Sequence, residues 1–133
     1  SNLKDNLAGV TWEQATRKVD SFNTIAVLVY HMNYYVSAVL KVFEGEALNA
    51  HDKYSFDMPA ITSQEEWDQL LNKTWSDVAQ FATQVAQLPE HKLWEPFTDE
   101  QYGIYYRNIH GIIEHCHYHL GQIAIIKKLV NRE

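Results

Sequence analysis

Three long stretches of the chain repeat hydrophobic and polar residues with the period of an α-helix. The first begins near Asn23 or Thr24 and runs to Glu44, after which Gly45 can take the left-handed conformation that ends a helix. Wound at about 100° per residue, its apolar side chains form one arc. The other side of the helix carries Asn33, Ser37, Lys41 and Glu44. The pattern predicts an amphipathic helix.

The second stretch follows Ser63, which forms a capping-box sequence with Glu66, and Pro89 ends it. Its apolar positions recur at steps of three and four residues: Trp67, Leu70, Leu71, Trp75, Val78, Phe81, Ala82, Val85 and Leu88. The third stretch runs from about Ile104 to Asn131. It carries Lys127, Lys128 and Arg132 near its end, where cations suit the helix dipole.

The remaining segments give weaker signals. Residues 1–10 are expected to be an exposed lead-in, and Thr11 opens a second capping box, which predicts a short helix over residues 11–18. Residues 45–62 show no sustained period and are interrupted by Pro59, so we expect a long ordered loop, with a second connection over residues 89–103. The sequence predicts one domain, residues 1–133, of the all-α class: an antiparallel four-helix bundle whose first helix is short or truncated.

Composition narrows the function classes. The 133 residues are 46% hydrophobic and 13% aromatic, which fits one packed domain rather than a disordered chain. The net charge is -6 and no basic cluster exceeds the pair Lys127–Lys128, so we expect no nucleic-acid partner. The longest apolar run, residues 25–30, is too short to span a membrane, and a single cysteine without a leader sequence favours the cytoplasm.

Histidine is the unusual residue, with seven in the chain. His115 and His119 lie one helical turn apart, although about 0.36 pairs with that spacing are expected by chance. Helical winding places both at the edge of the apolar arc, pointing inward, whereas it places His110 and His117 on the opposite face. A rival surface cluster would combine His110 and His117 with Glu114.

His31 is the candidate for a third metal ligand, because it is the only strongly polar residue in the apolar arc of its helix. A buried histidine satisfied by one hydrogen bond is the ordinary alternative. Two separate helices that each aim imidazole inward favour an open site of three histidines, since a shared divalent cation would satisfy all three rings. Such a cation would lower the pKa of a bound water or thiol.

A family resemblance rests on two segments. The first, IAVLVYHMNYYVSAVL, contains His31, and the second, GIIEHCHYHLGQIAIIKK, carries the motif H-x-x-Y-H-x-G-Q-I. Together they resemble the DinB/YfiT-like superfamily of four-helix metalloproteins, with a match from about residue 11 to 130. The resemblance implies a divalent metal, such as Zn, Ni or Fe, held by His31, His115 and His119, with positions left open to solvent.

The resemblance also implies functions. Members of this superfamily include transferases and isomerases that use small thiols such as bacillithiol or mycothiol, and metal-dependent hydrolases. Others have no assigned activity. The superfamily ordinarily has a full-length first helix, whereas only about ten residues precede Thr11 here. That helix is either absent or replaced by a stunted one, and a homodimer could cover the apolar surface left exposed.

Three further residues are candidates for orienting a ligand or substrate. Gln122 and Asn108 lie at angles close to that of His115 on the helix, and Tyr118 could reach the pocket from its edge. Packing roles are the alternative for each. A general acid or base would come from a loop residue such as Asp52, Tyr54, Asp57 or Glu90, and Cys116, in the middle of the apolar arc, is expected to be an inert core thiol.

The leading hypothesis is therefore a cytoplasmic metalloprotein that acts on a small molecule, as a thiol-dependent S-transferase or a metal-dependent hydrolase. In the alternative, the metal only stabilises a non-catalytic binding or interaction module. In a third reading the bundle holds no metal, and its inward histidines bind one another or the backbone.

Overall fold

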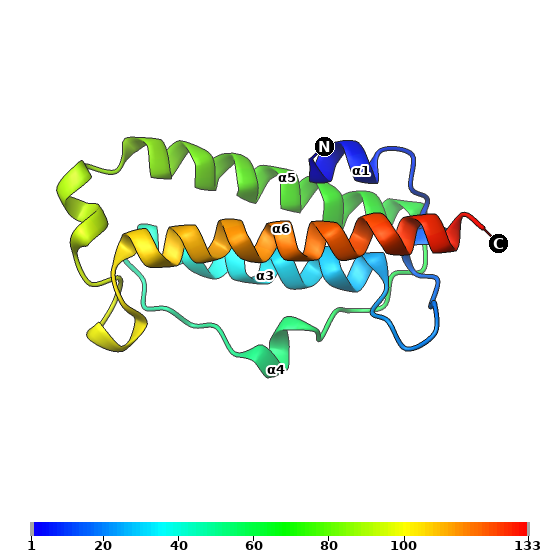
Figure 1. The fold of residues 1–133 in the computed structure, drawn as a ribbon, viewed down its shortest axis with the longest axis horizontal. Coiled ribbons are helices and arrows are strands. Elements are labelled where there is room, and N and C mark those ends of the chain that lie inside the picture. Colours follow the sequence, from blue (N-terminus) through cyan, green and yellow to red (C-terminus); the bar gives the residue numbers. More distant parts are fainter. Residues whose placement is uncertain (1, 133) are drawn as a thin grey trace.

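The computed structural model describes residues 2–132 and confirms the all-α class. Three long helices lie side by side: α3 (Ile25–Phe43), α5 (Gln64–Gln87) and α6 (Tyr105–Val130) (Figure 1). α3 and α5 run in the same direction, because the chain between them returns along the length of the bundle, and α6 runs opposite to both (Figure 1). No β-strand occurs within the described range.

Short elements connect the long helices. They are α1 (Leu3–Leu7), α2 (Trp12–Ala15), α4 (Asp52–Ser55) and the 3₁₀ helices η1 (Glu90–Trp94) and η2 (Glu100–Tyr102). The expected loop over residues 45–62 thus contains one helical turn, and the connection over residues 89–103 contains two 3₁₀ segments. We call residues 44–63, which link α3 to α5 and include α4, the crossover.

Local sequence signals place the ends of the helices correctly. The hydroxyl oxygens of Thr24 and Ser63 accept backbone N–H groups three residues later, at 3.2 Å in both cases. Gly45 follows α3 with a φ of +95°, the conformation expected of a glycine stop. The capping box of Thr11 and Gln14 is present, but the helix it opens ends at Ala15 rather than at residue 18.

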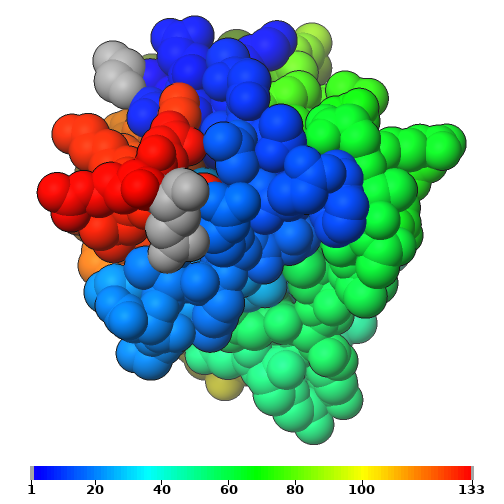
Figure 2. Space-filling model, turned by 90° about the vertical axis from the view of Figure 1, so that its right-hand side faces the viewer, coloured from blue at the N-terminus to red at the C-terminus, as the bar shows by residue number. Residues whose placement is uncertain are grey.

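The expectation of an exposed lead-in is wrong in part over residues 2–10, because two apolar side chains of this segment are buried, and Ser1 lies outside the described residues. Leu7 and Val10 are only 2% and 6% exposed, because α1 packs on the bundle. The buried indole of Trp67 donates a hydrogen bond of 2.9 Å to the carbonyl of Val10. Seen from the end of the bundle, the N-terminal segment lies between the end of α6 and the start of α5 (Figure 2).

The expected polar side of α3 is not solvated throughout. Asn33 is only 5% exposed, because α5 packs against this side of the helix. Its amide donates to Asp77 Oδ2 at 2.8 Å and its oxygen accepts from Lys73 Nζ at 3.0 Å. Lys73 and Asp77 are paired at 2.6 Å, so a polar bridge of three side chains joins α3 to α5.

A groove of about 550 Å³ remains along α5 and α6 where no long first helix covers them. Met32, Val36, Trp75 and Val78 line it, and Val78 is 40% exposed. α1 contributes Leu3, Lys4 and Asp5 to the lining of this groove and is only five residues long. The short first helix therefore leaves apolar surface open, as expected from the sequence.

Among residues 2–132, α3 alone is long and apolar enough to cross a membrane by length and composition. Two thirds of the window that passes this test, 67%, is buried inside the bundle. The core helix of a folded domain satisfies the same test, so this is weak evidence for a membrane span.

Candidate metal centre

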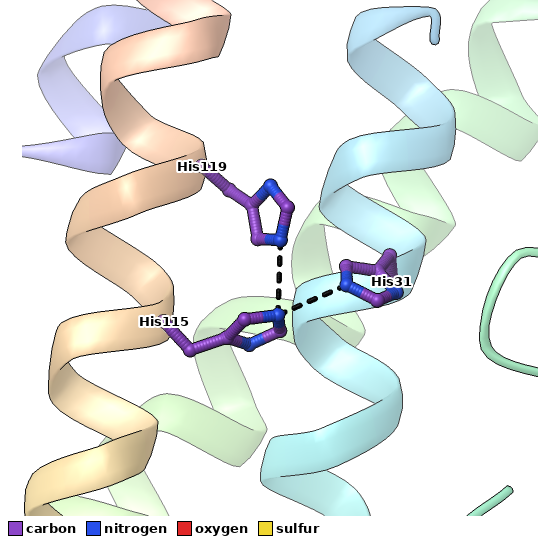
Figure 3. Close-up of side chains that lie close together, drawn as sticks. All are labelled: His31, His115 and His119. Atoms are coloured by element: carbon purple, nitrogen blue, oxygen red, sulfur yellow. Dashed lines mark hydrogen bonds between the residues drawn. The ribbon is translucent and has the colours of Figure 1, made fainter. Parts of the chain in front are cut away.

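Three imidazole rings meet between α3 and α6. His31 projects from α3, and His115 and His119 project from successive turns of α6 (Figure 3). His115 Nε2 lies 2.9 Å from His31 Nε2 and 2.9 Å from His119 Nε2. All three ligand atoms lie within 4.8 Å of one another. Residues separated by 84 positions in the sequence thus form one cluster.

The packing of both helices turns the rings inward. His31 and His119 are 6% and 7% exposed, and His115 is partly exposed. The rings of His31 and His119 meet edge-on, with centroids 4.7 Å apart. On its other side His31 is stacked on Phe56 of the crossover, at 4.0 Å and 8°. The crossover therefore covers one side of the cluster.

Hydrogen bonds at the outer nitrogens fix the tautomers of two rings. The Ser55 hydroxyl donates to the carbonyl of Asp52 at 2.8 Å, so its oxygen remains to accept from Nδ1 of His31 at 3.0 Å. The carbonyl oxygen of Gln122 can only accept, and it lies 2.6 Å from Nδ1 of His119. Both Nδ1 atoms therefore carry the proton, and the Nε2 atoms of His31 and His119 present lone pairs.

Those two lone pairs point at the same atom, Nε2 of His115, which has at most one proton when the ring is neutral. One N–H cannot serve two acceptors equally well, whereas a cation takes a lone pair from each of three rings. Three nitrogens at tetrahedral angles around Zn²⁺ are about 3.3 Å apart. The two 2.9 Å contacts to His115 would open by a few tenths of an ångström, and the nitrogens of His31 and His119, which lie within 4.8 Å of each other, would move together, so small ring rotations bring the donor set around such an ion.

The electrostatics favour the neutral form of His31 and His115. Burial, together with the neighbouring His115 and His119, lowers the pKa of His31 to about 4. Burial and the neighbouring His119 likewise lower the pKa of His115. The charge of Asp52 acts in the opposite direction but does not cancel this lowering. Neutral imidazole is the form that binds a metal, so the folded chain presents His31 and His115 in the required state.

A pocket of about 740 Å³ adjoins the cluster, and His31 and His115 form part of its wall. Tyr35 and Asp52 line it close to the histidines: the Tyr35 hydroxyl donates to the Asp52 carboxylate, and the Tyr35 ring meets both His31 and His115 edge-on, at 5.3 and 5.2 Å. Of the four loop residues named from the sequence as possible acids or bases, only Asp52 lines this pocket.

The other candidates occupy different positions. Gln122 contacts His119, as described above. Asn108 lines the pocket, but its amide donates to the carbonyls of Tyr102 and Ile104 at 2.7 and 3.0 Å, which ties it to the start of α6. Tyr118 is 67% exposed and its ring meets the edge of His119 at 5.0 Å, outside the pocket lining.

The rival cluster does not assemble. His110 and Glu114 are paired at 2.6 Å with side chains 57% and 67% exposed, and His117 is also exposed. Within residues 2–132, only His31, His115 and His119 form a group of three or more potential ligands. Cys116 is partly buried between the two hydrophobic clusters of the core, and burial raises the pKa of its thiol, as expected of an inert core cysteine.

Sequence reasoning did not single out Ser55, Phe56, Tyr35 or Arg107. Tyr35 follows the aromatic pattern of its helix and gives no separate signal, and Ser55 and Phe56 lie on the crossover, whose position depends on the fold. The helical spacing of Arg107 and His115, eight residues apart, is the one signal that could have found a pocket residue.

Comparison with known proteins supports the resemblance. A family model described as DinB superfamily matches residues 2–123. No curated protein and no solved structure matches the chain. The matched range spans most of the sequence and includes all three histidines of the cluster. The chain therefore belongs to the DinB superfamily.

Proposed function

We propose that this chain is a metal-dependent enzyme that uses a low-molecular-weight thiol or water to attack a small-molecule substrate. The reaction is either thiol-dependent S-transfer or hydrolysis. The observation that carries the proposal is that three converging imidazole nitrogens adjoin an open pocket of about 740 Å³. A metal that only joined helices would need no such opening.

His31, His115 and His119 would hold the cation through Nε2, since Ser55 and Gln122 occupy the outer nitrogens of two of the rings. When bound, a divalent ion such as Zn, Ni or Fe supplies Lewis acidity and lowers the pKa of a water or thiol, to about 7 for water on zinc. Three neutral ligands leave its charge uncompensated, which strengthens this effect.

The pocket lining contains no serine, threonine, cysteine or lysine. The carboxylate of Asp52 and the hydroxyl of Tyr35 are bonded to each other, so we take the attacking group to come from a small molecule. Tyr35 and Asp52 provide a fixed pair of polar groups next to His31 and His115, where they can orient a reactant by hydrogen bonding. Phe56 and Val39 add apolar walls to the pocket beside these groups.

The test begins with the metal content of the purified protein and its thermal stability with added Zn²⁺ or Ni²⁺. We expect close to one equivalent of metal and an increased melting temperature. Less than about a tenth of an equivalent with no thermal shift would contradict the metal site and favour the reading in which the histidines bind only one another.

The metal-loaded protein is then assayed with thiols plus electrophiles, and separately with ester and amide substrates. We expect turnover that His31→Ala abolishes and His110→Ala retains, because only the first residue belongs to the cluster. Turnover that survives His31→Ala would place the reaction elsewhere. A fully loaded protein that turns over neither set would contradict catalysis and leave the metal-stabilised binding module.

A further inference from the structure

We infer that the end of the pocket remote from the histidines is a subsite for an anionic group, built on Arg107. The substrate class that fits is a small molecule with an apolar body and a terminal carboxylate, whose reacting end lies at the histidines. This inference rests on the proposed function, because it assigns the rest of the same pocket.

Helical spacing aligns the two ends of the pocket. Arg107, Gly111 and His115 recur at intervals of four residues on α6 and all line the pocket. Positions four residues apart share one face of a helix, so the three form a single stripe. At 1.5 Å per residue, two such steps separate Arg107 from His115 by about 12 Å along the helix axis.

Gly111 leaves the space between these ends open. Glycine is a poor helix former, yet it occupies an interior position of the 26-residue helix α6. A Cβ atom built at Gly111 would meet no other atom within 4 Å, so packing of the bundle does not demand glycine there. A larger side chain at this position would occupy the pocket between Arg107 and His115.

The side chain of Arg107 is exposed, and no carboxylate of the described residues neutralises it. A Cβ atom at Gly103 would lie 3.1 Å from Cδ of Arg107, so the side-chain stem of Arg107 lies over this glycine, whose φ is +74°. No ion pair joins Arg107 to a carboxylate in the part of the chain that the structure describes, and Asp52, the acidic residue of the pocket lining, is bonded to Tyr35. The guanidinium fork matches the geometry of a carboxylate.

The walls between the two ends are apolar. Ala38, Val39, Leu48 and Ile112 line the pocket and offer no hydrogen-bonding side chain. They favour a hydrocarbon or aromatic segment in the middle of the ligand. The pocket therefore matches a molecule that is polar at both ends and apolar between them.

Matched probes test the subsite. Zinc-loaded protein is titrated with mercaptohexanoate and with mercaptohexanol, which share a thiol and chain length but differ in the carboxylate, and affinity is measured by calorimetry. We expect the carboxylate to bind about tenfold more tightly. Arg107→Met should remove this preference, while Lys128→Met, which deletes an exposed charge elsewhere on α6, should retain it.

A second pair of variants tests the channel. Gly111→Leu should weaken both probes by about tenfold or more, because the new side chain fills the space between the two ends. Gly121→Leu, an equivalent change at an exposed glycine of the same helix that lies outside the pocket, should leave both affinities unchanged. Zinc stoichiometry and the circular dichroism of every variant establish that the site and fold are intact.

The outcomes separate the inference from the proposed function. If zinc binds but the two probes bind equally, or if Arg107→Met keeps the preference, the subsite is wrong while the metal site stands. Zinc-free protein is also titrated with hexanoate and hexanol while the Arg107 Nε–H signal is followed by NMR. A carboxylate-dependent shift without zinc binding would support the subsite and contradict the metal-dependent function.

Discussion

Two side-chain pairs on α6 have the same spacing and different surroundings. His115 and His119 are four residues apart, and so are His110 and Glu114. The first pair faces α3 and the crossover, whereas the side chains of the second are 57% and 67% exposed. Five residues separate His110 from His115, which rotates them by about 140° around the helix. Spacing alone therefore does not distinguish a buried pair from an exposed one.

The difference lies in what other segments contribute. His31 from α3 adds a third nitrogen to the first pair, and Ser55 from the crossover fixes the ring of His31. Among residues 2–132, no third potential ligand joins the exposed pair in a metal-binding group. A site thus requires the facing helix and the loop that covers it, and each of the following changes tests one of these contributions.

Removal of the facing ligand should have the largest effect. We expect His31→Ala to weaken Zn²⁺ binding by more than about 100-fold, the upper range for loss of a residue that only supports a ligand. His110→Ala should leave the affinity unchanged. Competition with a chromophoric chelator measures both, and equal affinities for the two variants would show that the buried cluster is not the zinc site.

Removal of the supporting hydroxyl should have an intermediate effect. Ser55→Ala deletes the acceptor for Nδ1 of His31, and we expect zinc binding to weaken by about 10-fold to 100-fold. The control is Ser76→Ala, which alters an exposed serine on α5. The same chelator competition applies, and an unchanged affinity in Ser55→Ala would contradict the orienting role of the crossover.

Acid should destabilise the metal-free protein through the buried rings. The folded-state pKa of His31 is lowered from 6.5 to about 4, so folding favours its neutral form. The stabilisation is fully present above pH 6.5 and is lost as the pH falls towards 4. Melting curves of chelator-treated protein should show this decline, and His31→Ala should reduce its slope. Parallel profiles for the two proteins would show that His31 does not contribute.

Loss of the exposed pair of His110 and Glu114 should have the smallest effect on stability. Glu114→Gln removes the partner of His110, and we expect the free energy of unfolding to fall by less than about 1 kcal/mol, because both side chains are largely in solvent. Zinc affinity should be unchanged. Denaturant unfolding provides the measurement, and a larger loss would mean that this surface pair has a structural role.

Local signals in the sequence were sufficient to predict the three long helices. Thr24, Ser63 and Gly45 mark helix ends through hydrogen bonds with near neighbours, so no tertiary information is needed. The inward direction of His31, His115 and His119 followed from the apolar arcs around them. The family resemblance identified them as a set, which spacing alone could not do.

Features that depend on packing were harder to predict. Asn33 lies opposite the main apolar arc of α3 but is buried, because α5 covers a second side of that helix. The spacing of Leu3, Leu7 and Val10 is a helical signal, yet the segment is too short to stand out. Ser55, Phe56 and Asp52 reach the histidines only because the crossover returns along the bundle. The cytoplasmic location, the homodimer and the reaction type stay predictions.

The separation of 84 positions between His31 and His115 also determines when the cluster can form during synthesis. A nascent chain that ends before α6 contains only one of the three imidazoles, so it cannot form the site. An ion that binds all three rings therefore binds only the completed, folded chain, and it shifts the equilibrium from the unfolded to the folded state. Cellular metal supply would then influence how much of the completed polypeptide persists, in addition to how much of it is active.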